Sequence, residues 1–270
     1  MEENKKLIDI PILYEDENCV FINKPAGISV HGDGKTAEYT IADWVLEKYP
    51  ETINVGEDIE TRIKNQDVRI KKPGIVHRLD KETTGVMLIA KNKEAYEFFK
   101  NQFQDRETKK VYHAFVYGWP KEDLIHIDKP IGRDSSNIRR WVVGKFARGT
   151  MREAVTDVSV ISRFGWIKGK PAQNLVYSGK GSTEEDTFSF VEARPKTGRT
   201  HQIRVHLRSI NHPIVGDTLY APKRKMELGF TRFALHARSL SVYLQSGVEK
   251  EVIAPYPLDF ENALKFAKVI

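Results

Sequence analysis

The stretch that decides the fold is HRLDKETTGVMLIAKN, residues 77–92, because it joins a charged loop directly to a short apolar run. Residues 86–90 form that run, and its boundaries at Gly85 and Lys91 predict a buried strand. Asn92 can then cap a helix whose apolar residues follow helical spacing: Ala95, Phe98, Phe99 and Phe103. We therefore expect the charged loop to lie at the end of a rigid scaffold, where functional residues commonly lie.

Patterns typical of strands occur on both sides of this stretch. Residues 110–117 alternate, so that Tyr112, Ala114 and Val116 share one face of the expected strand. The other strand patterns cover residues 12–14, 19–22, 188–194 and 234–244.

Two further segments have helical patterns. Thr40 can cap a short helix, and Thr200 can cap a second one. Their apolar faces comprise Ile41, Trp44 and Val45 in the first helix and Ile203, Leu207 and Ile210 in the second. We expect residues 51–72 to form a polar loop and residues 168–186 an excursion between strands. Because strands outnumber helices without regular alternation, the sequence predicts an α+β fold with a mixed, largely antiparallel sheet and flanking helices.

Composition narrows the class of protein. Of the 270 residues, 40% are hydrophobic, enough for a sizeable core, and no apolar stretch is long enough for a membrane helix. A polar tail over residues 1–11 is not a secretory signal, and Cys19 as the single cysteine excludes an internal disulfide. We expect one domain over residues 12–270 and a cytoplasmic location. The net charge of +6 is compatible with a polyanionic partner.

The first candidate cluster for chemistry is the charged loop, residues 77–85. Asp80 is flanked there by Arg78 and Lys81. An ionised carboxylate can act as a nucleophile, a base or a metal ligand. The alternative is a surface carboxylate in a charged turn.

The second cluster covers residues 194–208, where a turn containing glycine leads into the expected helix. Backbone N–H groups and several cations come together at such a helix start, which favours an anion. Arg204 and Arg208 are four residues apart and share one helix face. The alternative is a solvated basic face.

The third cluster covers residues 133–152, in which Trp141 and Phe146 lie among basic residues: Arg133, Arg139, Arg140, Lys145, Arg148 and Arg152. Cations among aromatic rings fit phosphate neutralisation together with base stacking. The alternative is a solvated hairpin with two buried aromatic side chains.

A metal site is another use for the histidines and acids of these clusters. His77 and Asp80 are ligand types, but their spacing is not a zinc signature. His201 and His206 are five residues apart on the expected helix and so point from different faces. We therefore expect no metal.

Taken together, the clusters resemble the RluA family of RNA pseudouridine synthases. Residues 77–85 look like its catalytic H-R-L-D-x-x-T-S/T-G motif, with Thr84 where many members have serine. Residues 110–114 match its K-x-Y-x-A strand. Further matching segments are 12–16, 22–27, 194–207, 212–220 and 235–237. The family often carries an S4-type domain before the opening motif, and we expect none here.

The resemblance implies the pseudouridine synthase fold and an isomerase (an intramolecular transferase) that converts uridine to pseudouridine in rRNA or tRNA without a cofactor. It implies that Asp80 is the essential carboxylate. Tyr112 would stack against the target base and could serve as acid or base. Arg204 would pair with the aspartate, although Arg199 competes for that role. Arg78 would fill the position that the flipped nucleotide leaves.

RNA contacts are expected from the basic clusters as a whole: His77, Arg78, Arg199, His201, Arg139, Arg140, Lys145 and Arg148. Without an S4-type domain, we expect the stretch 133–152 to be a mobile loop that clamps RNA. We expect a monomer with no obligatory protein partner. Two alternatives stay open: attack of Asp80 on the sugar against a glycal route, and a non-catalytic RNA-binding or assembly protein on the same scaffold.

Overall fold

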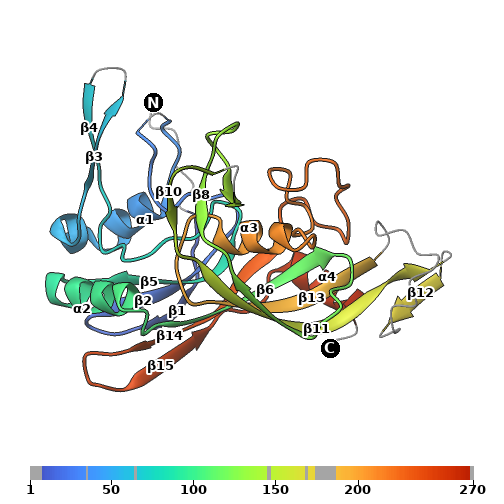
Figure 1. Ribbon diagram of the computed structural model, residues 1–270. Coiled ribbons are helices and arrows are strands. Elements are labelled where there is room, and N and C mark those ends of the chain that lie inside the picture. Colours follow the sequence, from blue (N-terminus) through green and yellow to red (C-terminus); the bar gives the residue numbers. More distant parts are fainter. Residues whose placement is uncertain are drawn as a thin grey trace, which may run out of the picture. The chain divides into compact units, whose positions relative to one another are not determined.

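The computed structural model describes residues 8–34, 36–63, 66–144, 147–167, 170–173 and 187–267 (Figure 1). The chain divides into two compact units. The first consists of Met1–Thr108 and Ser239–Pro255, the second of Lys109–Arg238 and Tyr256–Ile270. The single domain expected over residues 12–270 stays a prediction.

The first unit is built on antiparallel strands. Its strands include β1 (Ile12–Glu15), β2 (Cys19–Lys24), β5 (Thr84–Ala90), β15 (Glu249–Ile253) and the second half of β14 (Leu235–Tyr243). β2 pairs with both β1 and β5, and Phe21 lies opposite Leu88 with both side chains fully buried. Every residue of β5 is buried, which confirms the strand predicted from residues 86–90.

Helices α1 (Ile41–Lys48) and α2 (Lys93–Gln104) begin where the sequence predicts. Thr40 and Asp43 form a capping box, in which each side chain bonds the other residue's backbone N–H. Asn92 caps α2 by accepting from the N–H of Ala95 at 2.9 Å. The buried face of α2 differs in part from the expected one and comprises Ala95, Tyr96, Phe99 and Gln102.

The prediction of a polar loop over residues 51–72 is wrong. A 3-10 helix, η1 (Pro50–Asn54), is followed by the antiparallel strands β3 (Ile59–Ile63) and β4 (Gln66–Ile70). The charged residues hide a strand signal, because β-branched residues recur at alternate positions in 59–63 and again in 68–70. These two strands form a separate sheet.

The second unit also has an antiparallel sheet, with helices against it. Its elements include β6 (Lys109–Tyr117), β7 (Leu124–Asp128), β11 (Val155–Ile167), β12 (Lys170–Gln173), β13 (Thr187–Pro195), α3 (Gln202–Ser209) and α4 (Leu258–Ala267). β13 lies between β6 and β11, and β11 also pairs with β7 and β12. Phe115, Phe190 and Phe260 are buried in its core. Most of the excursion expected over residues 168–186 lies outside the described residues.

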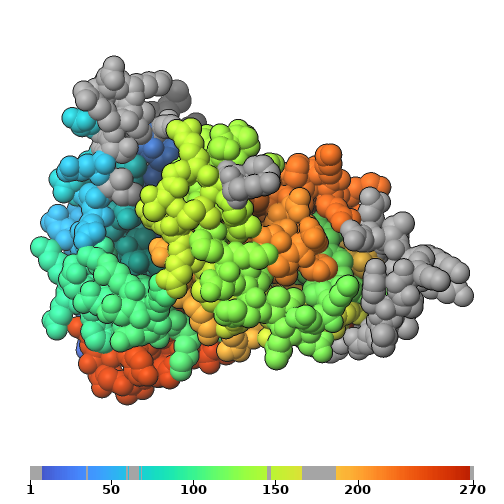
Figure 2. All heavy atoms as spheres, viewed as in Figure 1, coloured from blue at the N-terminus to red at the C-terminus, as the bar shows by residue number. Residues whose placement is uncertain are grey.

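The basic stretch 133–152 forms strands, not the loop that we expect from its sequence. β8 (Ile131–Asp134) pairs with β9 (Trp141–Val143) on one side and β10 (Ala147–Arg152) on the other. The basic stretch, yellow-green in Figure 2, forms part of the surface of the molecule. α3 lies against β9. Lys145 and Phe146 lie outside the described residues.

The α+β fold with a largely antiparallel sheet is confirmed by these pairings. Among the described residues, no helix is long and apolar enough to cross a membrane.

Candidate active site

Asp80 lies in the turn that precedes β5, and its side chain is half-buried. Its carbonyl accepts a hydrogen bond from the N–H of Thr83 at 3.0 Å. The turn is anchored by Lys24, whose side chain is fully buried at the end of β2. The Lys24 ammonium donates to the carbonyls of Pro25, Ile28 and Lys81 at 2.7, 2.8 and 2.9 Å. One buried cation therefore joins residues 25–28 to the residue that follows Asp80.

His77 fixes the other end of the same loop. Its Nε2 accepts from the N–H of Leu88 at 2.9 Å, and its ring stacks on Phe103 of α2, with the ring centroids 4.5 Å apart. These contacts hold the loop against β5 and α2. A role for His77 in RNA binding stays a prediction.

Arg78 is exposed, and its Nη1 lies 3.4 Å from Nε2 of His31. Nδ1 of His31 lies 2.9 Å from the carbonyl of Gly32. Burial lowers the pKa of His31, and the nearby cations Arg78 and Lys72 lower it further. A neutral His31 therefore donates to Gly32 and presents an acceptor to Arg78.

Tyr112 stands on β6, where it pairs with Ala193 of β13 and packs against the core of the second unit. The neighbouring His113 points to the opposite face of the strand. Nδ1 of His113 lies 2.6 Å from the hydroxyl of Tyr256. Tyr112 is half-buried, so an aromatic surface at this position is supported by the core.

Arg204 on α3 forms a buried ion pair with Asp217. Its Nε and Nη2 donate to the two carboxylate oxygens at 2.7 and 3.0 Å, and the two side chains are 6% and 1% exposed. The guanidinium carbon also lies 4.2 Å from the ring centroid of Phe233. We did not expect Asp217 from the residues alone, although it belongs to a matching motif segment. Pairing of Arg204 with Asp80 stays a prediction.

The start of α3 differs from the expected one. Thr200 is not its cap; the N-cap is His201, in the left-handed region at φ 56° and without a side-chain cap. Gln202 organises the turn instead, because its Oε1 accepts from the hydroxyl of Thr197 at 2.6 Å and the N–H of Arg199 at 3.0 Å. Its amide nitrogen donates to the carbonyl of Val155. A local propensity for threonine as a cap is overridden by this network.

The side chains at this turn also have partners within the second unit. Arg199 donates from Nε to the carbonyl of Glu153 at 2.9 Å, and Nδ1 of His201 lies 2.9 Å from the hydroxyl of Tyr220. Ile203 and Leu207 face the core, as expected. Of the basic stretch, Arg139 and Arg148 are exposed and Arg140 is half-buried.

His206 on α3 is fully buried, with Nδ1 2.9 Å from the hydroxyl of Thr156 and Nε2 3.0 Å from the carbonyl of Lys129. Burial lowers its pKa, as it does for His31 and His113. The folded chain therefore resists protonation of these imidazoles.

We expect the free energy of unfolding to fall as the pH drops from about 7.5 to about 5.5. Below about pH 6.5 the unfolded chain binds protons that the folded chain does not, so stability present above that pH is lost as the pH falls. Each such imidazole contributes a slope of up to about 1.4 kcal/mol per pH unit. Urea unfolding at several pH values measures this, and His206→Gln should flatten the profile. An equally steep profile in that variant would contradict the assignment.

Comparisons with known proteins agree with this architecture. The family model described as RNA pseudouridylate synthase matches residues 18–209. The chain is 34% identical over 262 residues to an uncharacterized RNA pseudouridine synthase of Synechocystis, covering 97% of this chain and 70% of that protein. It is 32% identical over 253 residues to ribosomal large subunit pseudouridine synthase D of Borreliella burgdorferi, covering 94% of this chain and 67% of that protein.

Solved structures give the same result. Human RNA Pseudouridylate Synthase Domain Containing 1 has a TM-score of 0.67 at 25% identity, covering 94% of this chain and 86% of the human one. Human RNA Pseudouridylate Synthase Domain Containing 4 has a TM-score of 0.65 at 27% identity, covering 95% and 92%. Fold and sequence thus define an isomerase whose substrate is RNA. The chain belongs to the RNA pseudouridine synthases of the RluA type.

Proposed function

We propose that the chain isomerises specific uridines of structured RNA without a cofactor, with Asp80 as the essential carboxylate acting on a flipped-out uridine. The observation that carries this proposal is the anchoring of the Asp80 turn by the buried ammonium of Lys24. A catalytic group must be held in place before the substrate arrives. An incidental surface carboxylate would need no such support.

The proposed chemistry breaks the N1–C1′ glycosidic bond, turns the uracil over and joins C5 to C1′. The proton on C5 is lost, and N1 ends protonated. Tyr112 gives the uracil a flat surface on which to turn, and Arg204 acts as the cation beside Asp80. Arg78, exposed on the same loop as Asp80, takes the place of the extruded nucleotide in the stack.

Ribosomal RNA is the favoured substrate class. The Borreliella burgdorferi relative carries the name of a large ribosomal subunit enzyme. Transfer RNA is the alternative, and the same experiment separates the two. The cytoplasmic location and the monomeric state remain predictions.

Mapping of pseudouridines in total RNA tests the proposal directly. RNA from cells that contain the chain should carry pseudouridines at sites that are unmodified in cells lacking it. Reintroducing the wild-type chain should restore those sites in rRNA. If the restored sites were confined to tRNA, the substrate class would be tRNA and not rRNA. No difference at any site, from a chain that still binds RNA, would indicate a binding role alone.

The basic stretch gives a second expected result. Replacing Arg139 and Arg140 with alanine should weaken RNA binding and flatten its dependence on salt, because each lost phosphate contact lowers the slope by about 0.7–0.9. The measurement is the dissociation constant at several salt concentrations. A matched double variant, Lys121→Ala with Lys265→Ala, removes the same charge from exposed positions outside this stretch. Equal slopes for the two double variants would show that the stretch does not touch RNA.

A further inference from the structure

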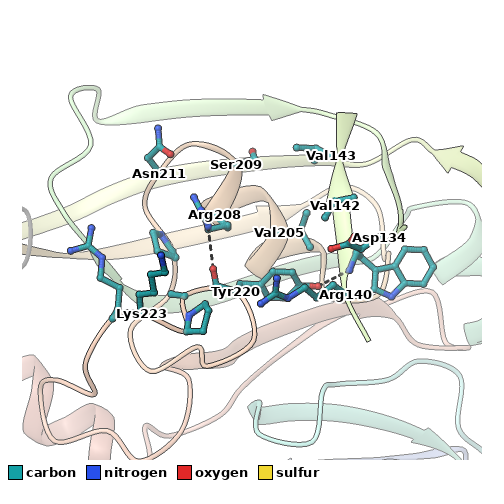
Figure 3. A pocket seen from close by; sticks show the side chains of 15 residues that line it. Asp134, Arg140, Val142, Val143, Val205, Arg208, Ser209, Asn211, Tyr220 and Lys223 are labelled. Atoms are coloured by element: carbon teal, nitrogen blue, oxygen red, sulfur yellow. Dashed lines mark hydrogen bonds between the residues drawn. The ribbon is translucent and has the colours of Figure 1, made fainter. Parts of the chain in front are cut away.

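The second unit contains a pocket of about 810 Å³ beside the carboxyl end of α3 (Figure 3). Residues of β9 border it on one side in this view, and Asn211 and Lys223 border it on the other. Val205 and Arg208 of α3 also line it. We call it the α3 pocket. Its volume lies within the range of sites that bind small organic groups.

The charge of the α3 pocket is strongly one-sided. Four cationic side chains line it against a single carboxylate, Asp134. The cations are Arg140, Arg208, Lys223 and Arg224. Arg208 and Lys223 are exposed, so they can reach a ligand from solvent. This balance favours an anion.

Apolar surface lies between these charges. Trp141, Val142 and Val143 on β9 are half-buried, and Pro222 offers a further apolar ring. Tyr220 fixes this wall, because its hydroxyl accepts from the N–H of Trp141 at 3.0 Å. A ligand that suits the pocket therefore has a flat apolar part and a negative charge.

One buried donor in the pocket has no partner among the residues that the structure describes. Nε of Arg140 is inaccessible to solvent, and no atom of the residues described by the structure accepts a hydrogen bond from it. Buried polar groups are nearly always paired, so such a donor needs an explanation. The side chain of Arg140 as a whole is only half-buried, so it can turn its Nε–H toward the pocket, where an acceptor on a ligand would supply the missing hydrogen bond.

We propose that the α3 pocket binds a second unstacked nucleotide of the RNA substrate, separate from the uridine that is isomerised. The base lies against the apolar side chains of β9, an acceptor on it or its phosphate bonds Nε of Arg140, and Lys223 neutralises phosphate. This inference rests on the proposed function for its substrate. A second fixed nucleotide selects RNA by shape, because only an RNA with an unpaired residue at the right place fills both sites.

Photo-crosslinking locates the nucleotide. The probe is total RNA that contains 4-thiouridine, taken from cells lacking the chain and mixed with the full-length protein. Mass spectrometry of the irradiated complex should find crosslinked nucleotide on peptides that carry Trp141 or Tyr220. Crosslinks confined to peptides that do not line the α3 pocket would overturn the proposal.

A matched pair of variants tests the unpaired donor. Arg140→Lys keeps the charge and loses the Nε–H donor, and Arg69→Lys makes the same change at an exposed position of β4, outside the pocket and the basic stretch. With tritium release from RNA tritiated at C5 of uridine, Arg140→Lys should raise the half-saturating RNA concentration about tenfold with kcat unchanged, the loss expected for one charge-assisted hydrogen bond. Arg69→Lys should change it less than about twofold.

These results also separate the inference from the proposed function. Equal half-saturating concentrations in both variants, with wild-type kcat, overturn the second nucleotide site and leave catalysis by Asp80 untouched. Full activity in a chain without the Asp80 carboxylate would overturn the catalytic assignment, and crosslinking at Trp141 would still stand.

Discussion

Asp80→Asn will lose tritium release from RNA labelled at C5 of uridine, by about 10²–10⁴-fold or more, the range for removal of a group that takes part in the chemistry. Asparagine has the same shape and removes only the ionisable group. The backbone carbonyl of Asp80 accepts from the N–H of Thr83, and Lys24 donates to the carbonyl of Lys81. These backbone contacts are available in the variant as well.

The dissociation constant for the same RNA should stay within about threefold of wild type, because the substitution removes no cation and no phosphate contact. Glu82→Gln, two residues further along the same turn, makes the same chemical change and should retain activity. Appreciable turnover in Asp80→Asn, or an equal loss in Glu82→Gln, would reject the assignment of Asp80.

Local patterns predicted local structure well. The strand before Lys91, the cap at Asn92 and the capping role of Thr40 follow from residues within a few positions of one another. The same holds for the inward face of α3. Such signals report short-range propensity and periodicity, which act before any tertiary contact forms.

Predictions failed where long-range contacts decide the structure. No role was predicted for the side chain of Lys24, and its ammonium lies buried among carbonyls, one of them 57 residues away. Gln202 displaced Thr200 as the organiser of the α3 turn, through contacts to Val155 and Thr156. In the basic stretch, charge obscured the strand pattern, because residues at the surface of a small sheet need not be apolar.

Asp217 is another residue whose role depends on a contact distant in the sequence, since it pairs with Arg204 from 13 positions away. Its carboxylate also accepts from the N–H groups of Leu219 and Tyr220 at 3.1 and 3.0 Å. One side chain therefore orients the proposed catalytic arginine and closes the turn that carries Tyr220. Because Asp217 occupies Nε and Nη2 of Arg204, it limits which part of the guanidinium can contact a substrate.

Asp217→Asn is expected to lower the free energy of unfolding by about 3–5 kcal/mol, because it removes the negative charge that is paired with the buried guanidinium of Arg204. Asparagine keeps an oxygen for the two backbone donors, so the loss reports the charge. Urea unfolding measures it, and Asp157→Asn is the matched control. Asp157 pairs with His126 and Lys196 at the surface, where an ion pair contributes about 0–1 kcal/mol.

A double variant isolates the pair itself. Arg204→Met with Asp217→Leu removes both charges and fills the space with apolar atoms, so it should recover much of the stability that Asp217→Asn loses. It should remain inactive, because the proposed catalytic cation is gone. If Asp217→Asn lowers the free energy of unfolding no more than Asp157→Asn does, the charge of Asp217 does not stabilise the guanidinium of Arg204. The orientation of Arg204 then has another source.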